Sequence, residues 1–166
     1  NCTASVAVTI TQPEALKTNI EGTDISCFGE TDGTITVGVA GGTEPYTYRW
    51  NDDNPQNRVA ERTNVAAGEY TVTVTDAHYC QSVETITLSQ PEEFTLSVAG
   101  DNEICAYETT TFTATTTGDV TLKWYLNDNE IANETNAILS NVNTAGTYKV
   151  VATQSGSNCT KEATIT

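Results

Sequence analysis

Short stretches of alternating polar and apolar residues dominate the chain, and no stretch keeps the helical period of 3.6 residues. The clearest are residues 34–39 (Thr-Ile-Thr-Val-Gly-Val) and 70–75 (Tyr-Thr-Val-Thr-Val-Thr). Turn-forming residues such as Asp32-Gly33 separate them. The pattern predicts strands near 15–21, 34–40, 45–51, 57–65, 69–76, 81–89, 94–99, 109–116, 120–127, 136–142, 147–154 and 160–166.

Several landmarks return along the chain at one interval, which indicates an internal repeat. The Gln-Pro-Glu sequence at 12–14 returns at 90–92, an offset of 90 − 12 = 78. The same offset relates Ala67-Gly68-Glu69-Tyr70 to Ala145-Gly146-Thr147-Tyr148, Cys2 to Cys80, and Cys27 to Cys105, while Cys80 and Cys159 are one residue further apart. Six or seven short strands per repeat are typical of a β-sandwich.

The phase of the repeat predicts three parts. Residues 14–91 form one complete module, and residues 92–166 form a second one that ends in its last strand. Residues 1–13 are expected to be the last strand of a preceding module that is otherwise absent. Proline suits the seams because it ends ladder pairing and fixes φ.

One predicted strand carries three aromatic residues on a single face, Tyr46, Tyr48 and Trp50, since residues two apart point the same way. Trp124 holds the matching place in the second module. A tryptophan on the third strand of a sandwich usually fills its core. The alternative is a platform on which a sugar stacks, with Tyr46 and Tyr48 as the contacts.

Tyr70 and Tyr148 each follow Ala-Gly-x at the start of a late strand. This placement resembles the tyrosine corner of immunoglobulin-like sandwiches, in which the ring packs and the hydroxyl caps a loop. The sequence therefore predicts an all-β protein of tandem immunoglobulin-like β-sandwich modules.

Charge narrows the classes of partner. The net charge is -15, with only seven Lys and Arg residues, so nucleic acid and anionic membrane surfaces are not expected as partners. No stretch approaches the roughly 18 apolar residues that cross a bilayer, so direct membrane insertion is not expected. Methionine is absent, and Asn1 in place of a start methionine predicts a fragment or a mature segment.

Five isolated cysteines indicate disulfides and hence an oxidising compartment, because none forms a C-x-x-C pair. We expect Cys27–Cys80 and Cys105–Cys159, which close loops of similar length (80 − 27 = 53; 159 − 105 = 54), with Cys2 bonded to a cysteine outside this sequence. Such loops stabilise by about 4 kcal/mol on the chain-entropy model. One difficulty is that a strict immunoglobulin topology puts these partners at opposite ends. The rival pairing is Cys2–Cys27 with Cys80–Cys105, which would join neighbouring modules.

Catalysis is not expected. The only histidine, His78, lies in a predicted turn, and a surface role suits it. Adjacent carboxylates such as Glu92-Glu93 point to opposite faces of a strand, which makes them poor glycosidase pairs.

No cofactor is required, and calcium is the only one the sequence suggests. Acidic residues stand in three predicted loops: Glu30, Asp32, Asp52, Asp53 and Asp76. The alternative is that these loops are simply well solvated. Chelator-sensitive stability would distinguish the two interpretations.

Residues 27–91 resemble the SprB repeat of Bacteroidetes gliding-motility adhesins. The resemblance rests on Ser-Cys-Phe-Gly at 26–29, Gly-Gly-Thr-Glu-Pro-Tyr-Thr-Tyr-Arg-Trp at 41–50, Ala-Gly-Glu-Tyr at 67–70, and the late Cys80 with its Gln90-Pro91 terminator. The family usually has Gly-Cys where this chain has Tyr79-Cys80. Residues 92–166 look like an immunoglobulin-like module common in the same proteins, and residues 1–13 look like the tail of another repeat.

The resemblance implies export by type IX secretion, display at the outer membrane, and use in surface attachment and gliding. On this basis we expect a non-catalytic segment of a large secreted adhesin that acts mainly as a rigid, disulfide-stabilised stalk. A glycan-binding module and a protein-docking module are the alternatives. The expected partners are an extracellular polysaccharide or surface, or other cell-surface proteins of the same machinery.

Overall fold

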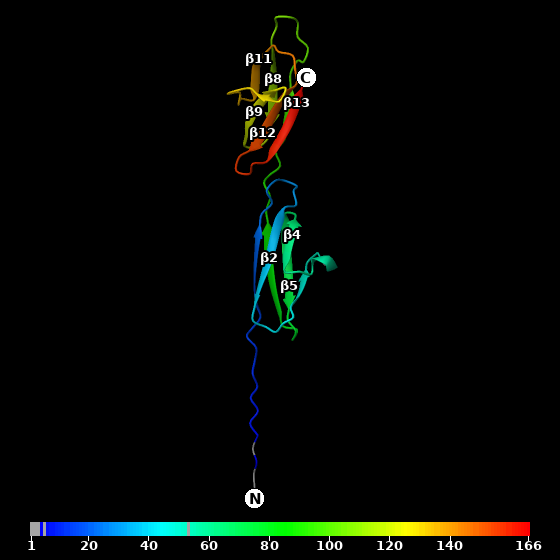
Figure 1. Ribbon diagram of the computed structural model, residues 1–166, viewed down its shortest axis with the longest axis vertical. Helices are drawn as coiled ribbons and strands as arrows, with labels where there is room; N and C mark the ends of the chain where they lie inside the picture. Colours follow the sequence, from blue (N-terminus) through cyan, green and yellow to red (C-terminus); the bar gives the residue numbers. More distant parts are fainter. Residues whose placement is uncertain (1–3, 5, 53) are drawn as a thin grey trace. The chain divides into compact units, whose positions relative to one another are not determined.

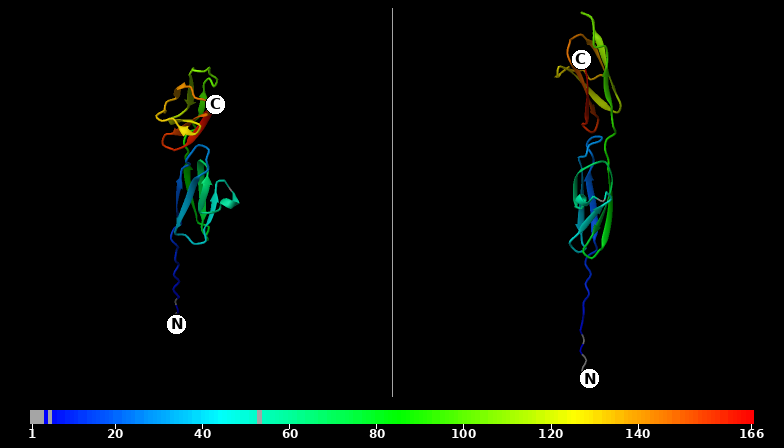
Figure 2. Two further views of the ribbon diagram at one scale, coloured as in Figure 1. Left: turned by 45° about the horizontal axis from the view of Figure 1, so that its top comes forward. Right: turned by 90° about the vertical axis from the view of Figure 1, so that its right-hand side faces the viewer.

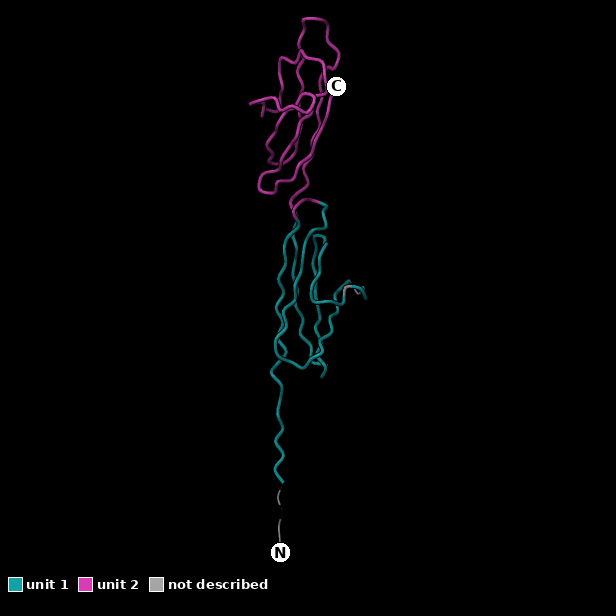
Figure 3. Tube along the Cα trace, viewed as in Figure 1, with its two compact units in different colours: residues 1–25, 29–90 teal, residues 26–28, 91–166 magenta. Residues whose placement is uncertain are grey.

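The computed structural model describes residue 4 and residues 6–52 and 54–166. The chain divides into two compact units (Figure 3). Unit 1 contains Asn1–Ile25 and Gly29–Gln90, and unit 2 contains Ser26–Phe28 and Pro91–Thr166. The chain therefore passes between the units three times, since the short segment 26–28 belongs to unit 2 although unit 1 flanks it on both sides.

Unit 1 is built from two antiparallel three-stranded sheets (Figure 1). The first has the order β1-β2-β4 and the second β3-β5-β6. Their bounds are β1 Lys17–Thr23, β2 Gly33–Ala40, β3 Thr47–Trp50, β4 Glu61–Val65, β5 Gly68–Thr75 and β6 Gln81–Leu88. Alternate residues of β2 and β5 form the core, where Ile35, Val72 and Val74 are completely buried.

Unit 2 repeats this plan with the orders β7-β8-β11 and β10-β9-β12-β13. Its strands are β7 Leu96–Ala99, β8 Thr110–Thr116, β9 Val120–Leu126, β10 Asn129–Glu130, β11 Ile138–Val142, β12 Tyr148–Gln154 and β13 Thr160–Ile165. Trp124 and Val150 are completely buried at its centre. The further views in Figure 2 show strands of each unit from other sides.

The predicted fold class is confirmed. In each unit the first, second and fourth main strands form one sheet, and the third, fifth and sixth form the other. This division of antiparallel strands over two sheets is that of an immunoglobulin-like sandwich. Alternation predicted it because every strand covers a core with one face only.

Two elements were not predicted. The expected strand 57–65 begins only at Glu61, because Pro55–Asn57 form a short 3-10 helix (η1) that Asn54 caps by accepting a hydrogen bond from the backbone N–H of Gln56. The two-residue strand β10 extends the second sheet of unit 2 through a tight turn after β9.

The expectation that residues 1–13 are the last strand of a preceding module stays a prediction, because the rest of that module is absent from this sequence. Residue 4 and residues 6–13 have no regular structure, and Val6, Val8 and Ile10 are each more than 80% exposed. A strand needs a hydrogen-bonded neighbour, and this segment has none in the described part of the chain.

Within the residues that the structure describes, no helix is long and apolar enough to span a membrane.

Candidate functional site

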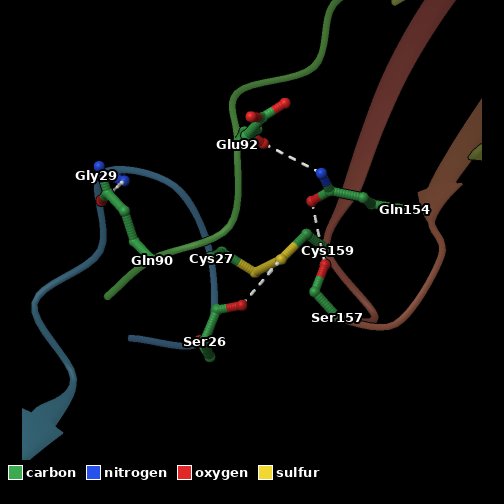
Figure 4. The surroundings of a disulfide bond; sticks show 8 residues. All are labelled: Ser26, Cys27, Gly29, Gln90, Glu92, Gln154, Ser157 and Cys159. Carbon is green, nitrogen blue, oxygen red and sulfur yellow. Dashed lines mark hydrogen bonds between the residues drawn. A yellow bond between two sulfur atoms is a disulfide. The ribbon is translucent and has the colours of Figure 1, made fainter. Parts of the chain in front are cut away.

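The disulfide between Cys27 and Cys159 is the most distinctive chemical feature of unit 2 (Figure 4). The Cα atoms of the two residues are 5.7 Å apart, within the normal range for a disulfide, and 132 residues separate them in sequence. Cys159 is buried and packs in the hydrophobic core of unit 2, against which Cys27 also packs. The bond therefore fixes segment 26–28 to the turn between β12 and β13.

The chain on both sides of segment 26–28 is held by hydrogen bonds inside unit 1. The backbone N–H of Ile25 donates to the Ser89 carbonyl oxygen at 2.9 Å, and the Ser89 N–H donates to the Asp24 carboxylate at 2.7 Å. The Gly29 N–H donates to the Gln90 side-chain oxygen at 2.9 Å. Ser89 and Gln90 thus anchor both ends of the cysteine-bearing segment. The hydrogen bond from the Ser89 N–H also lowers the pKa of the Asp24 carboxyl.

The β12–β13 turn that presents Cys159 is held equally well. The Gln154 N–H donates to the Cys159 carbonyl oxygen at 2.8 Å. The Gln154 side chain accepts from the Ser157 hydroxyl at 3.0 Å and donates to the Glu92 carbonyl oxygen at 3.0 Å (Figure 4). The sulfur is consequently carried on a turn with a defined backbone.

The expected pairs Cys27–Cys80 and Cys105–Cys159 are wrong. Cys80 and Cys105 are free and exposed. The rival Cys80–Cys105 pair is not formed either, and since Cys27 bonds to Cys159, the rival Cys2–Cys27 pair is excluded. Cys2 itself, with its expected partner outside the sequence, lies outside the described residues.

Strand direction explains the error. In unit 1 the bond from Ile25 to Ser89 places Cys27 near the end of β6, whereas Cys80 precedes the start of that strand. Eight residues at about 3.3 Å each separate those positions by about 25 Å. The same holds in unit 2, where Cys105 follows β7 but Gln154, beside Cys159, bonds to Glu92 ahead of β7. Neither distance can be closed by a disulfide.

The aromatic residues expected in the cores have buried or capped positions. Trp50 and Trp124 are 3% and 0% exposed, and their indole N–H groups donate to the carbonyl oxygens of Val59 at 3.1 Å and Asn136 at 2.9 Å. The structure thus places both indoles inside their sandwiches.

The two corner tyrosines make matching bonds. The Tyr70 hydroxyl donates to the Ala66 carbonyl oxygen and the Tyr148 hydroxyl to that of Thr144, both at 2.9 Å. Each acceptor lies four residues upstream of its tyrosine, so each ring spans the same corner of its module.

The tyrosines considered for glycan contact face the core of unit 1. Tyr46 and Tyr48 are partly buried and pack against its hydrophobic cluster. The Tyr46 hydroxyl donates to the Gly41 carbonyl oxygen at 2.6 Å, and burial together with the neighbouring Tyr46 raises the pKa of Tyr48. Glycan contact at Tyr46 and Tyr48 therefore stays a prediction, since both rings are only partly buried.

The structure describes four of the five acidic residues considered for calcium. In the described part of the chain, no group of three or more His, Cys, Asp or Glu side chains could hold a metal ion. The Asp52 carboxylate forms an ion pair with the Arg62 guanidinium, with a nitrogen–oxygen distance of 2.7 Å. That guanidinium lies over the Trp50 and Tyr70 rings. Asp53 lies outside the described residues, and Glu30 and Asp32 belong to the loop before β2.

Asp76 instead organises the β5–β6 turn that carries Cys80. Its carboxylate accepts from the backbone N–H groups of Cys80 at 2.8 Å, His78 at 2.9 Å and Thr43 at 3.0 Å. Burial raises the pKa of this carboxyl, but the backbone donors, with a contribution from the His78 charge, outweigh it and hold the pKa below its usual value. Asp76 is therefore a turn-capping residue.

Unit 2 also contains an open cavity of about 680 Å³ at the loop before β8. Residues 101–108 and 142–146 form most of its lining, and Cys105, Phe112 and Tyr148 contribute to it. The cavity brings together a free thiol, aromatic residues and the acidic residues Asp101, Glu103 and Glu108.

Two asparagines that the sequence pattern did not single out shape both modules. Asn64 in β4 and Asn141 in β11 have φ values of +56° and +59°. In each strand the pairing register shifts by one residue next to this position, which defines a β-bulge. The signal was available, since Asn-Val occurs at 64–65 and again at 141–142.

Comparison with curated proteins gives no match. Among solved structures, a three-domain immunoglobulin fragment of titin (an E-to-A variant) is 15% identical over 93% of this chain and 65% of its own, with a TM-score of 0.49. The eight N-terminal immunoglobulin domains of Down Syndrome Cell Adhesion Molecule are 12% identical over 91% of this chain and 23% of theirs, with a TM-score of 0.48. The chain thus spans less than two thirds of either structure, and no property of those proteins is carried over.

The family comparison is more specific. Residues 20–55 match the SprB repeat. The matched span contains Cys27, the double glycine at 41–42, and the Tyr46, Tyr48 and Trp50 positions. This chain therefore contains an SprB repeat.

Proposed function

We propose that this chain is a non-catalytic segment of a large secreted adhesin, displayed at the bacterial outer membrane and used in surface attachment and gliding. Within that protein it serves mainly as a rigid stalk. The SprB repeat at residues 20–55 supports the adhesin context. The Cys27–Cys159 disulfide is the single observation that carries the stalk role.

Covalent connectivity determines which parts of the chain carry tension. A pulling force applied at the two ends runs along the chain to Cys27, crosses the disulfide to Cys159 and continues to the other end. The chain between these cysteines, which includes β2 through β12 and the β12–β13 turn, is outside this path. Only residues 1–26 and 160–166 carry the force through the peptide backbone. Such a segment transmits tension even when its sandwiches unfold.

The rest of the chemistry suits an extracellular spacer. The net charge of -15 keeps a long array solvated and disfavours self-association. Buried indoles and tyrosine corners brace each sandwich internally. The partners of the parent protein would be an extracellular polysaccharide or surface, or other cell-surface proteins of the same machinery.

Single-molecule stretching between the two ends of the chain tests the stalk role. The oxidised chain should release no length from residues 28–158. The double variant C27S/C159S should release about 450 Å more contour length, from 132 residues at about 3.4 Å each. The matched control C80S/C105S keeps the bond and should behave like the unmodified chain.

Equal release of length from the oxidised chain and from C27S/C159S would overturn the stalk role. A separate binding experiment tests whether the segment is itself adhesive. The chain would be incubated with bacterial, algal and plant polysaccharides, with calcium and with chelator. A stalk should bind none of them, and saturable binding to one class would replace the stalk with a glycan-binding function.

A further inference from the structure

The two free cysteines occupy the same two structural positions as the bonded pair. Cys105 lies 78 residues after Cys27, in the loop between the first two strands of its module. Both loops turn one and two residues later, at 28–29 and 106–107. The second turn residue has a left-handed backbone in each case, with φ +80° at Gly29 and +74° at Tyr107. Cys27 and Cys105 are therefore equivalent, and we call them loop cysteines.

Cys80 and Cys159 are equivalent in the same way. Each directly precedes the last strand of its module, β6 or β13, and follows a residue with positive φ, +64° at Tyr79 and +44° at Asn158. Each carbonyl oxygen accepts from the N–H of the residue that opens the turn, Asp76 at 3.0 Å and Gln154 at 2.8 Å. We call Cys80 and Cys159 hairpin cysteines.

The bonded pair shows which positions combine. The loop cysteine of the earlier module, Cys27, bonds to the hairpin cysteine of the later module, Cys159. The remaining loop cysteine and the remaining hairpin cysteine are both exposed. Within a module, the loop position and the hairpin position lie at opposite ends of the sandwich. Neither free thiol can therefore reach the partner position of its own module.

We propose that Cys105 and Cys80 are attachment points for neighbouring modules of the same kind. Cys105 bonds to the hairpin cysteine of a following module, and Cys80 bonds to the loop cysteine of a preceding one. In each case two thiols lose two protons and two electrons and form one sulfur–sulfur bond. An oxidant with a disulfide bond accepts them and becomes two thiols. The inference concerns module linkage and does not rest on the adhesin role.

The consequence is a set of overlapping covalent loops. Cys105 lies between Cys27 and Cys159, so a bond from Cys105 to a later hairpin begins inside the loop that Cys27–Cys159 closes. Every stretch of backbone in such an array lies inside at least one closed loop. A single peptide-bond cleavage then leaves the array in one piece, which a row of separately closed modules does not achieve.

The test extends the full chain by one more copy of itself in the register of the repeat. Ile10, Leu88 and Thr166 are equivalent, at intervals of 78 residues. A chain of residues 1–166 followed directly by residues 11–166 therefore keeps the Gln-Pro seam in place. It would be oxidised in a mixture of reduced and oxidised glutathione, free thiols would be alkylated, and disulfide-linked peptides would be identified by mass spectrometry.

The expected product is a bond between Cys105 of the first copy and Cys80 of the second, beside Cys27–Cys159 in both copies. The Cys27–Cys159 bonds serve as the internal reference that both copies have folded. C105S in the first copy alone should leave Cys80 of the second copy alkylated, and C80S in the second copy alone should leave Cys105 of the first copy alkylated.

Two results would overturn the proposal. One is alkylation of both thiols in molecules that contain both Cys27–Cys159 bonds. The other is pairing without regard to position, such as Cys80 with Cys105 inside one copy or equal amounts of all possible pairs.

Discussion

Asn64 and Asn141 hold the bulges of β4 and β11 because asparagine tolerates a left-handed backbone better than other side chains that carry a Cβ. Both side chains are exposed, so the preference comes from backbone conformation and not from packing. A β-branched residue is the least suited to this conformation.

We expect Asn64→Val to lower the free energy of unfolding of unit 1 by about 1–2 kcal/mol, the usual cost of a left-handed residue with a Cβ. Asn64→Gly should change it by less than about 0.5 kcal/mol. Scanning calorimetry of the two variants provides the measurement. Asn141→Val repeats the experiment in unit 2, and a valine variant as stable as the glycine variant at both sites would contradict the explanation.

Asp76 gives unit 1 a defined dependence on pH. Its folded-state pKa is lowered, so its contribution to stability is fully present above the unfolded pKa of about 3.8 and is lost as the pH falls through the folded value. Asp76→Asn places an amide N–H group among backbone donors and should lower the melting temperature of unit 1 near neutral pH.

The difference in melting temperature between the unmodified chain and Asp76→Asn should stay constant from pH 7 to about pH 5 and shrink below about pH 4. Thermal unfolding followed at a series of pH values measures it. Glu30→Gln, at an exposed loop position, is the control for a general effect of removing one carboxylate. A difference that grows on acidification would contradict the assignment.

At the scale of elements, alternation predicted the strands well because each one covers a core with one face. It placed β2 and β5 to within one residue at each end. It missed η1, where the Asn54 cap and Pro55 in the first turn override the strand pattern.

The disulfide escaped prediction for a different reason. Cysteine spacing reports only loop length, and on the chain-entropy model a loop of 132 residues differs from one of 54 by only about 0.8 kcal/mol. The direction of the strands decides the pairing.

The β5–β6 hairpin offers an element-scale prediction. Tyr79 has φ +64° and is 86% exposed. Its left-handed backbone is therefore unfavourable, and packing of the ring offsets little of that cost. Tyr79→Gly should raise the free energy of unfolding of unit 1 by about 0.5–1 kcal/mol, after allowing for the greater freedom of glycine in the unfolded chain. Chemical denaturation measures the change.

Tyr79→Ala is the matched control for this hairpin, because it removes the ring and keeps the unfavourable conformation. It should give no gain in stability. If alanine and glycine stabilised the hairpin equally, the exposed ring and not the backbone would be responsible.

At the scale of the whole chain, the disulfide decides what a backbone cut does. Arg58 lies in an exposed segment between η1 and β4. The other six basic residues lie within strands: Lys17, Arg49, Arg62, Lys123, Lys149 and Lys161. Hydrogen-bonded strands resist proteases, so limited trypsin digestion should cut first after Arg58.

That cut divides the chain into residues 1–58 and 59–166, with Cys27 on one fragment and Cys159 on the other. Denaturing gels should therefore show one band without reductant and two bands with it.

Two cysteine variants distinguish the observed pairing from the pairing that cysteine spacing favours. With Cys27–Cys159, the C159S variant falls into two fragments without reductant and C80S stays in one piece. With Cys27–Cys80 the two variants would exchange these results. Because the bond survives denaturation, the outcome reports covalent connectivity alone, independent of how tightly either sandwich is folded.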